Sequence, residues 1–225
     1  MRPSKTKSTR ARSRKAKPAS PKQPALTQPL PAELAVAATK PLAHVTEEFF
    51  AEAVRELTER DADLARVIEK YGVPQIWVRE PGFPSLVYII LEQQVSLASA
   101  RALYQKLEKT VRPFTPEKFL KLTEVEMRQL GFSRQKSHYT RLLANAMKQK
   151  QFDLDALHAL HDDHAREKLV ALKGIGRWTS DIYLLSALRR PDIWPIGDLA
   201  LAIAARLFWH AYLCKRGQSS ATVSL

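Results

Sequence analysis

Two glycines separated by one residue stand ahead of an apolar run in LKGIGRWTSDIYLL, residues 172–185. Gly174 and Gly176 have no side chain to cover their backbone N–H groups, and a helix starting near Arg177 adds its own free N–H groups beside them. Such a group of donors can bind one phosphate, and the charges of Lys173 and Arg177 would assist. The alternative is an ordinary turn that ends one helix and begins the next. The spacing alone leaves both interpretations open.

An acidic residue, Asp198, follows a glycine in WPIGDLALAIA, directly before a second apolar run. The local sequence predicts that Asp198 is the N-cap of a helix, because a carboxylate there accepts hydrogen bonds from free backbone N–H groups. A cap of this kind also holds the carboxylate in a fixed position. One residue can therefore have a structural and a chemical role at the same time.

Three histidines, His158, His161 and His164, stand among aspartates in LHALHDDHAREKL and superficially resemble a metal-binding cluster. Steps of three residues drift around a helix, so the three imidazoles converge poorly on one ion. We expect a solvated capping segment and no metal site. The single cysteine, Cys214, excludes an internal disulfide and a cysteine-ligated iron–sulfur cluster, and it is typical of a reducing compartment.

The charge of the chain favours an anionic partner, nucleic acid above all: 36 Lys and Arg against 23 Asp and Glu give a net charge of +13. The first 24 residues hold nine basic and no acidic side chains, so residues 1–43 are expected to be a disordered basic tail. The tail either adds DNA affinity or only solubility, and it is also compatible with a transit peptide. Without a transmembrane or secretory segment, we expect a cytoplasmic, nucleoid-associated protein, or a nuclear or organellar one in a eukaryote.

The elements that must position these residues are all predicted to be helices. Apolar residues recur at helical spacing from His44 onward until Gly72, a C-cap, and again over residues 86–110 as one long helix. Residues 115–149 are predicted to form two helices, the second capped by Ser133. The fold class is therefore all-α.

Five segments resemble, in order, the helix-hairpin-helix superfamily of DNA glycosylases, and most closely its alkylpurine (3-methyladenine) branch. They are FPSLVYIILEQQVSLASARALYQKL, GFSRQKSHYTRLLA, LKGIGRWTSDIYLL, WPIGDLAL and RLFWHAYL, between Phe83 and Leu213. The resemblance implies a two-lobed helical fold with the active site in the cleft between the lobes. It further implies a base excision repair enzyme that binds damaged double-stranded DNA, extrudes an alkylated purine and hydrolyses its N-glycosidic bond.

The resemblance also implies the role of two residues. Asp198 matches the essential aspartate of the superfamily, which would stabilise an oxocarbenium-like deoxyribose and orient or deprotonate the attacking water. One carboxylate can suffice, because a purine alkylated at N3 or N7 is already cationic and leaves readily. Trp178 stands where bifunctional relatives carry a nucleophilic lysine, so the resemblance implies a monofunctional enzyme without lyase activity.

A base pocket and a DNA-binding surface follow from the same resemblance. Trp178 and Trp209 match positions that stack the extruded base, and a cationic purine over an indole gains cation–π attraction. Tyr183 and Phe83 lie close in sequence and are added to this pocket, with burial in the core as the alternative. Gln94 matches the wedge that fills the gap left by the extruded nucleotide, and its alternative is an exposed helix glutamine. The predicted DNA-binding residues are Gln94, Lys173, Gly174, Ile175, Gly176, Arg177 and Thr179.

The chain departs from the family pattern after about residue 201, where GDLALAIAARLFWHAYL runs on directly. We expect an internal deletion there, a helical domain over residues 44–213 and a disordered tail over residues 214–225. A DNA-binding module of the same fold with impaired catalysis, and a helical protein-interaction domain, are the alternative functions. The expected partner is double-stranded DNA with alkylated bases, the expected state is a monomer without membrane contact, and no cofactor is implied beyond a monovalent cation at the hairpin carbonyls.

Overall fold

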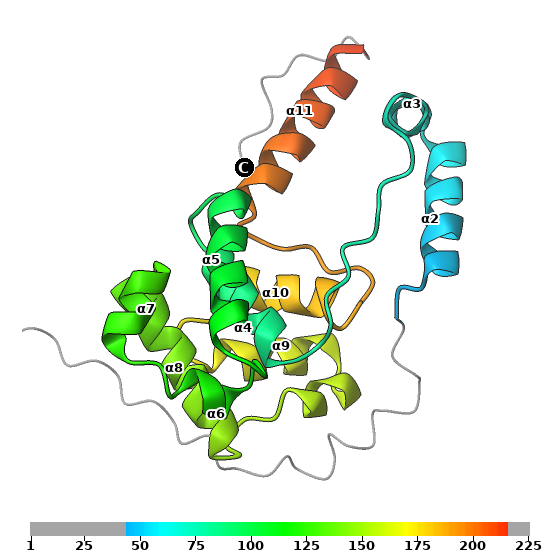
Figure 1. The fold of residues 1–225 in the computed structure, drawn as a ribbon. Coiled ribbons are helices and arrows are strands. Elements are labelled where there is room, and N and C mark those ends of the chain that lie inside the picture. The colour runs from blue at the N-terminus through cyan, green and yellow to red at the C-terminus, as the bar shows by residue number, and fades with distance from the viewer. Residues whose placement is uncertain (1–43, 216–225) are drawn as a thin grey trace, which may run out of the picture.

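The computed structural model describes residues 44–215, with side chains described as far as Phe208, and every regular element in this range is a helix. The predicted all-α class is confirmed. The predicted tail of residues 1–43 and the final residues 216–225 lie outside the described residues. The elements in Figure 1 are α2 (Glu47–Arg60), α3 (Ala62–Tyr71), α4 (Phe83–Glu92), α5 (Leu97–Thr110), α6 (Pro116–Phe119), α7 (Glu124–Leu130), α8 (Arg134–Lys148), the 3₁₀ helix η1 (Asp155–Ala159), α9 (Asp162–Val170), α10 (Arg177–Ser186) and α11 (Leu199–Lys215).

Polar caps divide helices that periodicity predicted to be continuous. Asp61 separates α2 from α3, because its carboxylate accepts hydrogen bonds from the backbone N–H groups at the start of α3. The single helix predicted over residues 86–110 is also wrong: Gln94 has a φ of +56° and Ser96 caps α5 with its hydroxyl. A third break precedes Thr123, which forms a capping box at the start of α7. The predicted caps Gly72 and Ser133 are confirmed.

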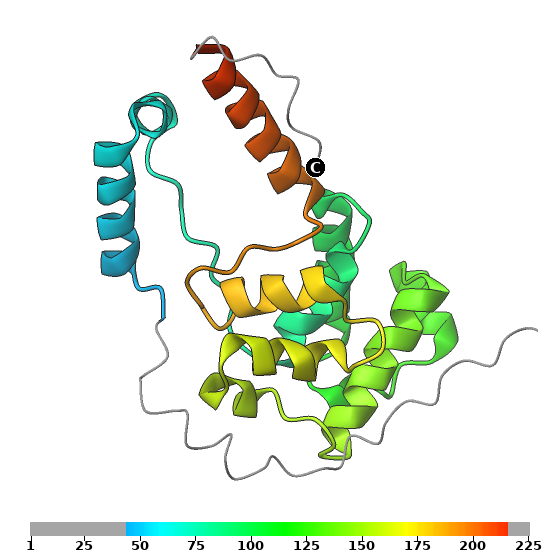
Figure 2. The same ribbon diagram turned by 180° about the vertical axis from the view of Figure 1, so that it is seen from behind.

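Helix α4 is the centre of the core. It packs against α5, α8 and α10, while α9 packs along α10 (Figures 1 and 2). Its apolar side chains are buried because neighbouring helices surround it, which suits a helix with apolar residues on nearly every face. The buried apolar residues of α4 are Phe83, Leu86, Val87, Ile89, Ile90 and Leu91.

The N-terminal helices α2 and α3 lie at the periphery and contain no buried residue. They pack on each other, and hydrogen bonds join the segment before α2 to the segment after α10. The Val45 N–H donates to the Arg189 carbonyl at 2.8 Å, and the His44 ring pairs with the Leu188 carbonyl at 2.9 Å. This pair of helices is therefore joined to the core mainly by its connecting segments.

Helix α11 projects from the body of the molecule in both views (Figures 1 and 2). Its apolar residues Leu199, Ile203 and Leu207 are exposed. The helix runs without a break past the point of the predicted deletion and ends at Lys215, beyond the predicted domain end at residue 213. No helix in the part of the chain that the structure describes combines the length and the apolar character needed to cross a membrane.

Candidate functional site

The glycine stretch forms the turn between α9 and α10. The Ile175 N–H donates to the Leu172 carbonyl at 3.1 Å, and α10 begins at the predicted Arg177. Gly174 has a φ of +93°, and a Cβ atom there would lie 2.1 Å from Cγ of Tyr139. Only glycine fits, because the backbone conformation and the approach of the Tyr139 ring both exclude a side chain.

Gly176 differs from its neighbour, since its φ is −95° and a Cβ atom would meet nothing within 4 Å. It is the N-cap of α10, and no side chain caps this helix end. The unpaired N–H groups of a first helical turn, with the positive end of the helix dipole, form an anion site. The turn and the helix start therefore provide the donors that the sequence predicted for a phosphate.

The other predicted DNA-binding residues of the turn differ in what their side chains can reach. Lys173 is exposed, whereas Arg177 is about half exposed, 53%, and its Nε lies 3.2 Å from Oδ2 of the buried Asp181. Ile175 and Thr179 are buried, so their side chains support the turn from the protein side. Lys173 is thus the freer cation of the two, and the binding of DNA by these residues stays a prediction.

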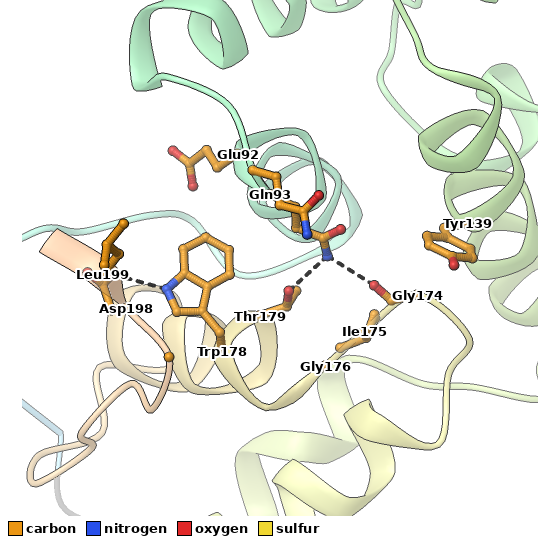
Figure 3. Close-up of a pocket in the computed structure, with 12 residues that line it drawn as sticks. Glu92, Gln93, Tyr139, Gly174, Ile175, Gly176, Trp178, Thr179, Asp198 and Leu199 are labelled. Carbon is orange, nitrogen blue, oxygen red and sulfur yellow. Dashed lines mark hydrogen bonds between the residues drawn. The ribbon is translucent and has the colours of Figure 1, made fainter. Parts of the chain in front are cut away.

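A cavity of about 720 Å³ opens beside this turn, a size that would hold a purine base and its sugar. Its walls come from four places that are far apart in the sequence: the end of α4, one residue of α8, the turn with the start of α10, and the loop before α11 (Figure 3). The lining residues are Glu92, Gln93, Gln94, Tyr139, Gly174, Ile175, Gly176, Trp178, Thr179, Gly197, Asp198 and Leu199.

Asp198 lies on the wall of this cavity and caps α11. Its Oδ1 accepts a hydrogen bond from the Leu201 N–H at 2.9 Å, which confirms the predicted N-cap. Its Oδ2 accepts one from Nε1 of Trp178 at 3.0 Å (Figure 3). These bonds, that of Trp178 first, lower the pKa of Asp198 below its ordinary value, although burial acts in the opposite direction. The carboxylate is therefore ionised at neutral pH and held from two sides.

Gln93 was not predicted as a site residue, yet it joins two walls of the cavity. Its Nε2 donates to the Gly174 carbonyl at 3.0 Å and to Oγ1 of Thr179 at 2.9 Å (Figure 3). The predicted wedge, Gln94, follows directly, is exposed and has a positive φ, a conformation that costs energy for a residue with a side chain. Gln93 thus fixes the position from which Gln94 projects.

Two residues predicted for the base pocket lie in the core, which corrects that assignment. Tyr183 is fully buried, its hydroxyl accepts a hydrogen bond from the Gly82 N–H at 2.9 Å, and burial raises its pKa to about 12. Phe83 is buried in edge-to-face contact with Phe114 and Phe119, at ring-centroid distances of 5.6 and 5.8 Å. Neither lines the cavity. Trp209 belongs to α11, but its side chain lies outside the described residues.

Within the described residues, no three His, Cys, Asp or Glu side chains lie close enough together to hold a metal ion, near the cavity or elsewhere. His158, His161 and His164 lie in and after η1 and at the start of α9, away from the cavity walls. Their segment has a structural link to the core, since the His158 carbonyl accepts a hydrogen bond from the buried Arg190 at 2.8 Å.

Known proteins are similar to this chain in sequence and in fold. The profile of the HhH-GPD family, described as "HhH-GPD superfamily base excision DNA repair protein", matches residues 87–222. A Bacillus subtilis protein named DNA-3-methyladenine glycosylase is 27% identical over 142 residues, 58% of this chain. The chain spans only about half the length of the curated relatives it matches, 57% and 45% for two of them.

Two solved structures extend the similarity to three dimensions. The DNA-3-methyladenine glycosidase of Bacillus halodurans is 32% identical with a TM-score of 0.57, over 68% of this chain and 71% of that one. The Schizosaccharomyces pombe 3-methyladenine DNA glycosylase in complex with abasic DNA has a TM-score of 0.63 and 24% identity, over 73% and 86% of the two chains. The second match shows the shared fold.

Proposed function

Because the chain belongs to the HhH-GPD superfamily of base excision DNA repair proteins, we propose that it is a DNA glycosylase that releases alkylated purines and leaves an abasic site. The names of the bacterial relatives support 3-methyladenine as a substrate. The observation that carries the proposal is the ionised, doubly hydrogen-bonded Asp198 on the wall of a cavity that would hold a purine base and its sugar, beside the glycine turn.

The chemistry follows from where these groups lie. The N–H groups of the turn and of the first turn of α10 hold a phosphate, so the attached nucleotide is presented to the cavity. As the bond from C1′ to the purine nitrogen breaks, its electron pair leaves with the base and the sugar becomes oxocarbenium-like. Asp198 stabilises that charge and orients a water whose oxygen adds to C1′, with the proton passing to the carboxylate or to solvent. The indole of Trp178 offers a face for the extruded base.

We further propose that the enzyme has no lyase activity. A Schiff-base lyase needs an amine at the sugar, and the described residues that line the cavity include no lysine. A nearby candidate, Lys136, has its pKa lowered by burial, but its Nζ donates to the Leu91 carbonyl at 2.6 Å and does not reach the cavity wall. Borohydride reduction during turnover should therefore trap no covalent protein–DNA adduct, whereas a trapped adduct would contradict this proposal.

A monovalent cation at the hairpin carbonyls remains part of the proposal, and the turn suits it. The Leu172 and Gly174 carbonyls each accept one hydrogen bond, from Ile175 and Gln93, and a carbonyl oxygen has a second lone pair for a cation. A cation bound there would add positive charge near the phosphate. Replacing potassium by a bulky quaternary ammonium ion at constant ionic strength should weaken the binding of abasic-site DNA.

Chromatography of the bases released from methylated duplex DNA tests the proposed function. We also propose that the protein acts on this DNA as a monomer. The wild type should release 3-methyladenine or 7-methylguanine without heating, and Asp198→Asn should not. A wild type that binds abasic-site DNA and releases neither base would instead be a non-catalytic DNA-binding module. The cavity with an ionised carboxylate on its wall favours the enzyme.

A further inference from the structure

A second carboxylate belongs to the same cavity and has no part in the chemistry described above. Glu92 is the last residue of α4 and lines the cavity, although its side chain is only 6% exposed. Its Oε1 accepts a hydrogen bond from Nη2 of Arg79 at 2.8 Å. Glu92 and Asp198 reach the cavity from different elements, the end of α4 and the loop before α11 (Figure 3).

Arg79 is fixed behind Glu92. Its backbone N–H donates to the Ser186 carbonyl at 3.0 Å, and its guanidinium lies 4.5 Å from the ring centroid of Tyr88. Tyr88 in turn stacks on Tyr104, with ring centroids 4.4 Å apart. Arg79 does not line the cavity, so the pair presents its negative end to the cavity and keeps its positive end in the wall.

The charged side chains that line the cavity have one sign. Among the described residues that line it, Glu92 and Asp198 are acidic and none is basic. A buried ion pair is a poor source of stability, because removing two charges from water offsets most of their attraction, and apolar residues of similar size often stabilise as well. The position of Glu92 is thus better explained by what enters the cavity than by the stability of the fold.

We propose that Glu92 is a specificity-determining residue that makes the cavity prefer a positively charged purine, with Arg79 as its positioning residue. This inference rests on the proposed glycosylase function. A purine nucleotide alkylated at N3 or N7 carries a positive charge before its bond breaks, whereas an undamaged purine does not. The Glu92 carboxylate attracts that charge and can accept hydrogen bonds from an exocyclic amino group, while Asp198 acts at the sugar.

The test compares release of a cationic and a neutral base, using 7-methylguanine and hypoxanthine in otherwise identical duplexes. In single-turnover experiments with the enzyme well below saturation, where the rate includes binding, Glu92→Gln should lower the ratio of the 7-methylguanine rate to the hypoxanthine rate about tenfold, the scale of one lost charge–charge interaction across a cavity. Arg79→Lys keeps a cation beside Glu92 and should leave the ratio near its wild-type value. Arg79→Gln leaves the buried carboxylate without its partner, which favours the protonated form, and should lower the ratio as well. The matched control is Glu124→Gln, which removes a carboxylate 3.2 Å from Arg141 in an ion pair away from the cavity.

Glu92→Gln and Arg79→Lys separate an electrostatic role from a structural one, because only Glu92→Gln removes the negative charge. The inference is overturned if Glu92→Gln slows both bases by the same factor, or if Arg79→Lys lowers the ratio as Glu92→Gln does. Should hypoxanthine release be too slow to measure, the affinities of the Asp198→Asn variant for the two duplexes are compared instead, and adding Glu92→Gln should weaken the preference for the 7-methylguanine duplex. A wild type that releases no base at all contradicts the proposed function itself.

Discussion

The core around α4 and the peripheral helices differ in how they are held, and the cavity lies between the core and the start of one peripheral helix, α11. Helix α4 is buried by α5, α8 and α10, whereas α2 and α3 bury nothing and α11 exposes Leu199, Ile203 and Leu207. Three walls of the cavity belong to the core, and the fourth, with Asp198, belongs to the start of α11. The difference indicates that the position of Asp198 relative to the core depends on its bond to Trp178 more than on the packing of α11.

The largest expected effect comes from replacing Asp198, the carboxylate at the start of α11. Asp198→Asn should slow the release of 3-methyladenine by about 10²–10³-fold, because a neutral amide cannot stabilise a developing positive charge. Binding to abasic-site DNA should change little, since the glycine turn is intact. Single-turnover release and a binding titration measure the two quantities.

The control for this variant is Asp192→Asn, in the same loop but exposed and away from the cavity, which should behave as the wild type. Equal losses in the two variants would mean that the loop, and not the carboxylate, determines the rate.

Alanine substitutions test the contrast between core and periphery directly. Ile90→Ala removes a fully buried side chain of α4 and should lower the free energy of unfolding by about 3 kcal/mol. Leu57→Ala, on α2, removes a side chain that is 52% exposed and should cost less than about 0.5 kcal/mol. Urea unfolding followed by circular dichroism measures both, and similar losses would show that α2 is packed more firmly than its exposure indicates.

The two glycines of the turn provide a matched pair of substitutions. Gly174→Ala should weaken binding of abasic-site DNA and destabilise the protein by about 2 kcal/mol, because the new Cβ atom collides with the Tyr139 ring at a positive φ. Gly176→Ala meets open space at an ordinary φ and should leave the stability within about 0.5 kcal/mol. Fluorescence anisotropy at fixed salt measures the affinity. Equal effects of the two substitutions would mean that the turn does not depend on a glycine at residue 174.

Sequence reasoning correctly predicted features that depend on one residue type and the backbone beside it, such as helix caps and turns. Asp198 and Ser133 were predicted as caps because free N–H groups at a helix start require an acceptor, and the turn at Gly174 was located by its glycines. These features depend on the backbone within a few residues. The all-α class followed in the same way from helical spacing.

The parts that sequence reasoning missed depend on contacts between distant segments. Periodicity runs through Gln93 and Gln94, so nothing local shows that α4 stops at Glu92 and that the Gln93 side chain bonds to the glycine turn. Tyr139 meets Gly174 only because α8 packs against α4. Phe83 and Tyr183 were wrongly placed in the pocket, since an aromatic residue beside a motif has the same local sequence whether it faces a cavity or the core.

The smallest expected effect concerns the bond that ties Asp198 to the core. Trp178→Phe keeps an aromatic ring but removes the N–H that contributes most to the lowered pKa of Asp198, so that pKa should rise toward its ordinary value. The ionised carboxylate is the active form, and the release rate falls as the pH drops through its pKa. The acidic limb of the rate–pH profile should therefore move to higher pH. The control is Trp194→Phe, which changes an exposed tryptophan in the loop that carries Asp198 and should leave the acidic limb in place. If the acidic limb of Trp178→Phe stays at the wild-type pH, the Leu201 N–H alone keeps Asp198 ionised. The core would then form the cavity without affecting the protonation state of Asp198.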